Sequence, residues 1–185
     1  MGGIRDLLKI TLLCIAGAIA YGLVHDQITA RVCQEYFTLG HDTPLFVPRN
    51  PTMLGLFWGV AATWWVGLLI GLPLAAAMRL GKLPPLDTRW LVPKLIRLLL
   101  IMLGVAVAGL ALTLFADLGG YLPASWKLIV PEGVPDKKIG RYVADAVAHN
   151  LSYGVGFFGG VQLWTSALLT RRRLRSAQAA IQSPS

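Results

Sequence analysis

Two tyrosine–histidine pairs carry the side chains best suited to chemistry in this chain. Tyr21 and His25 are four residues apart at the end of the first apolar segment, and His149 and Tyr153 have the same spacing at the start of the last one. Residues four apart share a face of a helix. If the two segments run antiparallel through a membrane, both histidines lie near one surface, each with a tyrosine one turn deeper. The sequence therefore places titratable, metal-competent groups at one edge of an otherwise apolar chain.

Acidic residues accompany both pairs. Asp26 follows His25 directly, and Asp145 lies one helical turn before His149. Tyrosine, histidine and aspartate side chains commonly satisfy one another's hydrogen bonds and hold helix ends together. We therefore predict a polar network at the outer membrane edge, made of Tyr21, His25, Asp26, Glu35, Asp145, His149 and Tyr153.

The same groups have a competing interpretation as metal ligands. Imidazole and carboxylate bind zinc and other transition metals, and a zinc hydroxide at the interface would hydrolyse a lipid ester or amide. Two histidines at equal depth also suit axial ligation of haem. No HExxH or CxxC spacing is present, so we expect no cofactor and keep zinc or haem as alternatives. The metal alternative would use His25, Asp26, Glu35, Asp145 and His149, with His41 as a further candidate.

Four long apolar segments must position these residues. The chain has 185 residues, of which 55% are hydrophobic and 14% charged, a balance unlike that of soluble domains. Uncharged helical runs of about 20 residues cross a hydrocarbon core of about 30 Å. We predict an all-α, integral membrane four-helix bundle forming one domain over 1–185. Its helices lie near 7–27, 53–78, 95–116 and 143–170, joined by outer loops at 28–52 and 117–142 and an inner loop at 79–94, with a solvated tail at 171–185.

The positive charges indicate the orientation. Most of the 17 basic residues flank the first helix, fill 79–94 or follow the last helix, whereas most of the nine acidic residues lie in the other two connections. The positive-inside rule then makes both termini cytoplasmic. The net charge of +8 thus indicates the orientation in the membrane, and we expect anionic lipid headgroups to balance it. We do not expect the basic residues to bind nucleic acid.

The first helix has a second interpretation. Arg5 and Lys9, the apolar run and Ala18-Ile19-Ala20 also fit a secretory signal with a cleavage site. Cleavage would leave three helices, beginning at Tyr21. The two cysteines form no disulfide framework, because Cys14 lies within the membrane and Cys33 outside it, roughly 28 Å apart along a helix.

Small residues recur every fourth position in the second and last apolar segments. Such ridges let helix backbones approach closely in a membrane. We expect them to pack these helices within the bundle, with homodimerisation through one ridge as the alternative, and we expect at least one indole of Trp64-Trp65 to fill the bundle core. The ridges consist of Gly55, Gly59, Thr63, Gly67 and Gly71, and of Ala148, Ser152, Gly156 and Gly160.

Four short stretches resemble a family of small bacterial four-helix inner-membrane proteins that has no established activity. They are YGxxHDQ(I/V)T, Glu35-Tyr36-Phe37, Trp64-Trp65-Val66-Gly67 and HN(L/F)SY, which begin here at Tyr21, Glu35, Trp64 and His149. Gln34 stands where the family pattern has proline. The resemblance implies a bacterial inner-membrane location and marks these residues as a motif, but it implies no reaction.

A transporter is disfavoured, because the second and third helices carry no ionisable group near mid-membrane. We therefore expect a non-enzymatic membrane protein with a structural, accessory or protein-interaction role. Its partners would be the lipid bilayer and a second membrane protein or another copy of itself. The alternatives are a metal-dependent, lipid-directed hydrolase and a haem-binding bundle that uses His25 and His149.

Overall fold

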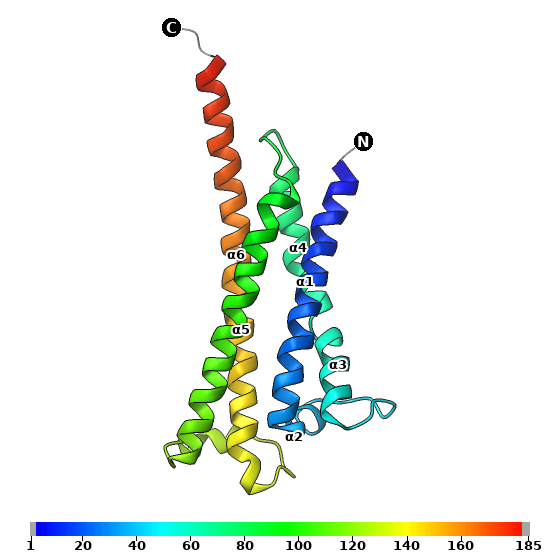
Figure 1. Ribbon diagram of the computed structural model, residues 1–185, viewed down its shortest axis with the longest axis vertical. Coiled ribbons are helices and arrows are strands. Elements are labelled where there is room, and N and C mark those ends of the chain that lie inside the picture. The colour runs from blue at the N-terminus through cyan, green and yellow to red at the C-terminus, as the bar shows by residue number, and fades with distance from the viewer. Residues whose placement is uncertain (1–2, 183–185) are drawn as a thin grey trace.

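The computed structural model describes residues 3–182, which are mainly helical and contain no β-strand. The predicted all-α fold is thus confirmed for this part of the chain. Figure 1 shows the helices running along one long axis. The elements are α1 (Gly3–Val32), α2 (Gln34–Thr38), α3 (Pro51–Ala61), α4 (Trp64–Arg79), α5 (Thr88–Leu118) and α6 (Ile139–Gln182), with 3₁₀ turns η1 (Ala124–Ile129) and η2 (Asp136–Lys138).

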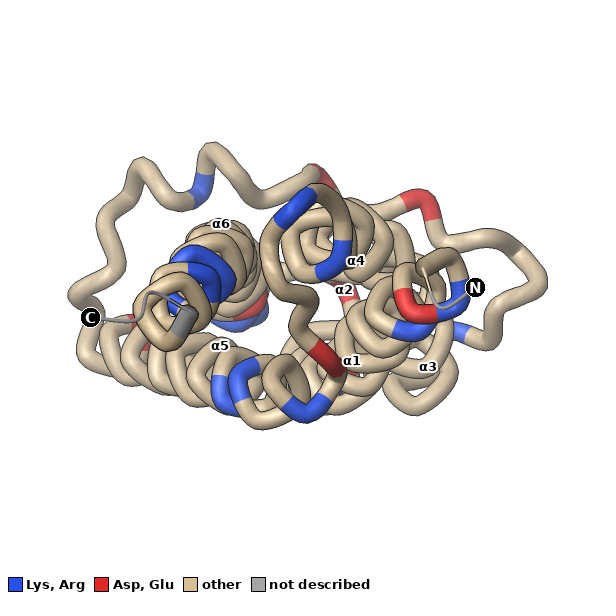
Figure 2. Tube along the Cα trace, turned by 90° about the horizontal axis from the view of Figure 1, so that it is seen from above, with Lys and Arg blue, Asp and Glu red and all other residues tan. Residues whose placement is uncertain are grey.

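The long elements alternate in direction. α1 runs from one end of the molecule to the other, α3 and α4 return together, α5 runs down again and α6 returns past the starting level (Figure 1). The start of α1 and the end of α6 therefore lie at the same end. Seen from that end, Lys and Arg gather on the facing ends of α1, α4, α5 and α6 (Figure 2).

Three stretches are long and apolar enough to cross a membrane: Gly3–Val32, Pro51–Arg79 and Thr88–Leu118. Large apolar side chains such as Leu112 (69% exposed) face outward from them, as a lipid solvent favours. These features are compatible with a membrane protein. The fourth expected span lies in α6, which is not among the three, because its glycines and polar side chains dilute its hydropathy.

The helices pack as two pairs. α1 lies along α3 and α4, whereas α5 lies along α6, and contacts of α4 with α6 and of α1 with α5 join the pairs. The small-residue ridge of α3 and α4 faces α1: a Cβ added at Gly59 would meet the backbone of Gly22, and one at Gly67 would meet Ile15. In α6, Gly156 faces Met102 of α5 and Gly160 faces Ile70 of α4. The α6 ridge therefore meets side chains of two neighbouring helices, whereas the α3–α4 ridge meets the backbone of α1.

The second expected span is broken near its middle. α3 ends at Ala61 and α4 begins at Trp64, where the sequence pattern predicts one continuous helix. The hydroxyl of Thr63 donates a hydrogen bond to the Gly59 carbonyl at 2.5 Å, and such bonds bend helices. Close contact of Gly59 with α1 then fixes the bend, because no side chain separates the two backbones.

Three residues lie elsewhere than the sequence pattern indicates. Trp64 and Trp65 are 47% and 46% exposed, so neither indole fills the bundle core. Glycines occupy the face of α4 that packs on α1, which leaves the large rings at positions that point outward. Arg171 is buried, at 1% exposure, and is therefore not part of a solvated tail. The helix α6 continues beyond it to Gln182.

A buried histidine–aspartate cluster as the candidate functional site

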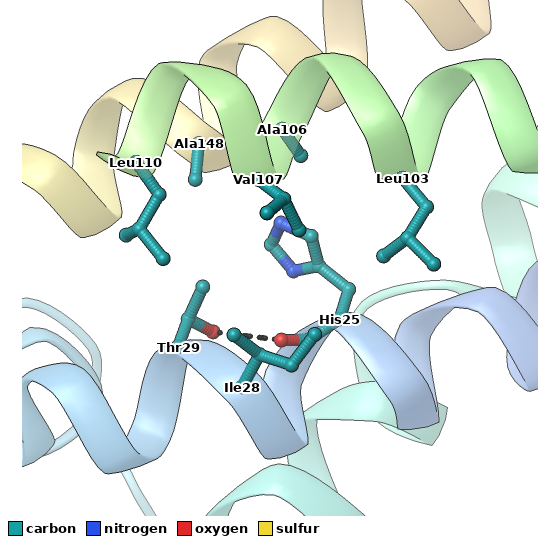
Figure 3. A pocket seen from close by; sticks show the side chains of 8 residues that line it. All are labelled: His25, Ile28, Thr29, Leu103, Ala106, Val107, Leu110 and Ala148. Atoms are coloured by element: carbon teal, nitrogen blue, oxygen red, sulfur yellow. Dashed lines mark hydrogen bonds between the residues drawn. The ribbon is translucent and has the colours of Figure 1, made fainter. Parts of the chain in front are cut away.

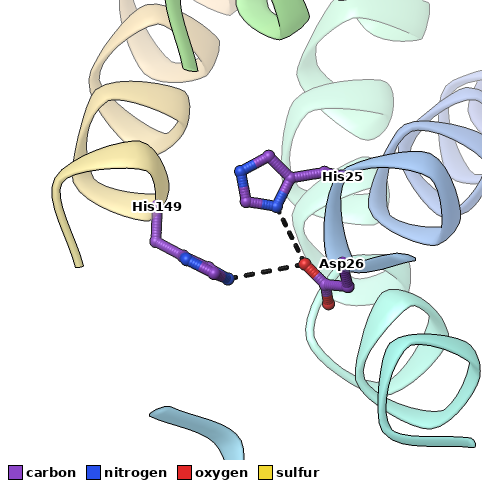
Figure 4. Close-up of side chains that lie close together, drawn as sticks. All are labelled: His25, Asp26 and His149. Carbon is purple, nitrogen blue, oxygen red and sulfur yellow. Dashed lines mark hydrogen bonds and ion pairs between the residues drawn. The ribbon is translucent and has the colours of Figure 1, made fainter. Parts of the chain in front are cut away.

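The candidate site joins the two helix pairs. His25 and Asp26 come from α1, and His149 comes from α6 (Figure 4). Each offers one ligand atom, and the three atoms lie within 4.8 Å of one another. His25 Nδ1 is 2.9 Å and His149 Nε2 is 3.4 Å from the same oxygen, Asp26 Oδ1. The two imidazole rings meet edge to face, with centroids 4.5 Å apart.

Neighbouring backbones seal the cluster. His25 and Asp26 are each 4% exposed and His149 is 7% exposed. A Cβ added at Gly55 of α3 would meet the Asp26 carbonyl, so this helix covers α1 at close range. The Thr29 hydroxyl donates to the His25 carbonyl at 3.2 Å, which keeps the next turn of α1 tied to the site.

Aromatic rings close the site from the loop side. The Tyr36 ring of α2 stacks on the His149 imidazole with centroids 4.4 Å apart, and the Phe37 ring contacts it at 5.7 Å. On the side away from the loop, the Tyr21 ring stacks on His25 at 5.5 Å. Each imidazole therefore has one aromatic ring stacked on it, and both are buried away from bulk water.

The hydrogen bonds of His149 define its tautomer. Its Nδ1 lies 2.8 Å from the backbone carbonyl of Asp145, and a carbonyl only accepts, so Nδ1 carries the proton. In a neutral ring, Nε2 then presents a lone pair to the Asp26 carboxylate oxygen. Two acceptors at this separation repel, and the contact is favourable only with a second ring proton or with a cation between them.

Three buried polar atoms in or beside the cluster have no hydrogen-bond partner within the described chain. They are Nε2 of His25 and both carboxylate oxygens of Asp145. The imidazole of His25 points from α1 toward Val107 of α5, beside a cavity of about 10 Å³ (Figure 3). Apart from His25 and Thr29, the residues that line this cavity are apolar, and a water there would lack the two to four polar partners that buried waters have.

The remaining predicted network residues lie around this core. Tyr21 Oη is 2.5 Å from Ser152 Oγ, which links α1 to α6 one turn deeper than the histidines. Tyr153 is half-exposed and contacts only the edge of the site, with its ring centroid 6.4 Å from that of His149. His41 is elsewhere, because its Nδ1 bonds the Tyr36 carbonyl and its ring lies against Trp58.

Glu35 is engaged outside the three-residue cluster. Lys138 Nζ of η2 donates to Glu35 Oε1 at 2.5 Å, and the Cys33 thiol donates to Oε2 at 3.5 Å. Burial raises the pKa of the Glu35 carboxyl, but the bond from Lys138 outweighs it, and the net pKa is lowered. Burial also raises the pKa of the Cys33 thiol to about 12. On this side of the site, Glu35 is held in an ion pair with Lys138, and the neighbouring Cys33 thiol stays protonated and unreactive.

Sequence reasoning missed several contributors. Tyr36 and Phe37 are the aromatic cover of His149, and their position beside Glu35 in the motif is a signal that could have assigned them to the site. Ser152 was interpreted only as a packing residue, although its hydroxyl binds Tyr21. Lys138 gave no local signal, because it lies 103 positions from Glu35.

Comparisons of the chain with protein-family models, curated proteins and solved structures found no match. The geometry of the cluster therefore carries the functional argument. Its three side chains are buried, and the adjoining cavity of about 10 Å³ is too small for an organic substrate.

Proposed function

We propose that this chain is a multi-pass protein of the bacterial inner membrane with a structural, accessory or protein-interaction role. Its four spanning helices are held together at the outer edge by the His25–Asp26–His149 cluster. The observation that carries the proposal is the burial of this cluster between the two helix pairs. A network placed there locks α1 to α6 and leaves the outer loops as a fixed surface for a partner.

The membrane location rests on the apolar surface. Three stretches have the length and hydropathy of membrane spans. α6 completes the set as a fourth span, because it carries large exposed apolar rings, with Phe157 65% and Phe158 72% exposed. Such rings are stable against lipid and unfavourable in water. The basic residues at the end that holds both termini then favour a cytoplasmic position for that end.

A non-enzymatic role is favoured by the closure of the site. A lipid-directed hydrolase needs a metal with an open position that a substrate carbonyl can reach. Here the histidines and Asp26 are at most 7% exposed. Haem is disfavoured by the rings themselves, because edge-to-face imidazoles with centroids 4.5 Å apart leave no space for a porphyrin between them.

Unfolding measurements on the detergent-purified protein test this proposal. His149→Ala removes the hydrogen bond to the Asp145 carbonyl, the contact with Asp26 and the ring on which Tyr36 stacks, all in a buried site. We expect a loss of about 1–3 kcal/mol in the free energy of unfolding. Asn150→Ala is the matched control, since Asn150 is the next residue of α6 and is exposed.

Two results would contradict the proposal. If His149→Ala and Asn150→Ala unfold at the same denaturant concentration, the network does not lock the helices. The orientation is tested separately with reporter domains fused after the last residue and within the 119–138 connection. The reporters should lie on opposite sides of the membrane, and a shared side would refute the four-span arrangement.

A further inference from the structure

We propose that His25, Asp26 and His149 bind one divalent transition-metal ion, for which zinc is the best match, with Asp145 as the additional protein ligand. This inference deepens the proposed function, because the ion would join α1 to α6 within the same network. The donor set supports it first. Imidazole nitrogen and carboxylate oxygen are preferred zinc ligands, and the three donor atoms converge within 4.8 Å.

The tautomer of His149 is the second support. Metal-bound histidines usually donate their other ring N–H to a carbonyl or carboxylate, which turns the free lone pair toward the ion. His149 has this arrangement, with Nδ1 on the Asp145 carbonyl at 2.8 Å and Nε2 facing Asp26 Oδ1 at 3.4 Å. A cation between nitrogen and oxygen converts the repulsion of two acceptors into two coordinate bonds.

Charge balance is the third support. Asp26 and Asp145 are both buried, and among residues 3–182 neither carboxylate forms an ion pair with Lys or Arg. Two basic side chains of this region are engaged elsewhere: Lys138 binds Glu35, and Arg31 binds Gln27 and Thr52. One divalent ion would balance both carboxylates in their ionised form.

The unpartnered atoms are a fourth and independent support. Buried polar atoms without a hydrogen bond are rare, because leaving them unpaired is costly. Three occur together here, namely Nε2 of His25 and both oxygens of Asp145. Asp145 lies one turn before His149 on α6, although its oxygens are not among the three donor atoms that converge within 4.8 Å. An ion that Asp145 also ligated would satisfy the Asp145 oxygens, whereas His25 meets Asp26 through Nδ1, so its Nε2 does not bear on the ion.

The closed surroundings indicate a structural site. Structural zinc sites are filled by four protein ligands, whereas catalytic sites keep one position for water or substrate. Two histidines and two aspartates supply four ligands from two helices. The Tyr36 ring, stacked on His149, would then cover the ion from the loop side.

Metal analysis of the full-length, detergent-purified protein tests the site. The protein is prepared without a polyhistidine tag and without chelator, since a tag would itself bind zinc. We expect about one zinc per chain by elemental analysis. After removal of metal with EDTA, ZnCl₂ should restore the melting temperature, and CoCl₂ should give the visible absorption bands of a four-coordinate cobalt site.

Variants assign the ligands. Asp26→Asn keeps the size of the side chain and removes its charge, and His149→Gln replaces the imidazole nitrogen with an amide, a weaker zinc ligand; each should weaken zinc binding about tenfold or more. Asp145→Asn should weaken it similarly. His41→Gln is the matched control, because His41 is bonded to the Tyr36 carbonyl outside the cluster and should leave binding unchanged.

The outcomes separate this inference from the proposed function. A folded wild-type protein with no stoichiometric metal, no zinc-dependent melting shift and no cobalt bands overturns the metal site, whereas destabilisation by His149→Ala would still support the network. Metal retained in Asp26→Asn and His149→Gln also overturns it. If these variants do not fold, the response of the wild-type melting temperature to EDTA and zinc decides.

Discussion

Replacing Arg171 with methionine should release the end of the bundle where α4 passes into the following loop. The Arg171 side chain leaves α6 and donates four hydrogen bonds to backbone carbonyls at the end of α4 and in the following loop. Nε donates to Pro84 at 2.8 Å, and Nη2 donates to Leu80 and Leu83 at 2.8 Å and 2.7 Å. Nη1 donates to the Ala77 carbonyl. One guanidinium therefore caps α4 and fixes the loop to α6.

The magnitude follows from these bonds. A hydrogen bond contributes about 0.5–1.5 kcal/mol net, and more where the donor is charged. Water can reach some of the carbonyls once the guanidinium is gone, so we take about 0.5–1 kcal/mol for each bond. Four bonds give an expected loss of about 2–4 kcal/mol for Arg171→Met. Arg171→Lys should lose most of the same free energy, because a compact ammonium cannot match four divergent acceptors.

The assay is equilibrium unfolding in mixed micelles, with Arg172→Met as the matched control. Arg172 is the next residue of α6 and is exposed, so its replacement should change stability by less than about 0.5 kcal/mol. Hydrogen exchange provides a local measurement. The Leu86 amide donates to the Met78 carbonyl across the loop at 2.9 Å, and it should exchange faster in Arg171→Met.

Equal stabilities of Arg171→Met and Arg172→Met would refute this reasoning. So would a large loss of stability with unchanged exchange at Leu86, because the clamp acts on the loop that contains this amide. A loss confined to the clamped loop would instead show that the inner end unfolds separately from the rest of the bundle.

The outer end yields two further predictions. Lys138→Met should cost up to about 1 kcal/mol at neutral pH, because it leaves Glu35 without its cation. Since the folded state lowers the pKa of Glu35, this stabilisation is present above the carboxyl's unfolded pKa and is lost as pH falls through the folded value. The difference in unfolding free energy should therefore begin to shrink as pH falls below the unfolded carboxyl pKa of about 4.3, and it should vanish below the lower folded value; a pH-independent difference would contradict the ion pair. Cys33 is 2% exposed, and burial raises the pKa of its thiol to about 12. Iodoacetamide at pH 8 should therefore label this thiol slowly in the folded protein and rapidly in SDS. Equal labelling rates in the two conditions would show that the segment around Cys33 opens freely.

The candidate site could be predicted in part. The spacing of Tyr21 and His25 and of His149 and Tyr153 follows from local helix periodicity, which is why both histidines were assigned to one edge. Their contact through Asp26 depends on the rotation of α1 and α6 about their axes. Periodicity defines a face of each helix but does not specify which neighbour the face meets. For this reason the ion pair between Glu35 and Lys138 could not be predicted from the local sequence either.

The sequence alone determined the helical class, the apolar stretches and the block pattern of charge, because each depends on residues that are close together in the chain. Tertiary structure decided which helices pair, since small-residue ridges allow several close partners with similar energies. It also decided that α3 and α4 separate near Thr63 and that Arg171 turns inward. These features depend on acceptors and backbones supplied by distant segments. Only the packed molecule brings two histidines and an aspartate to a single point.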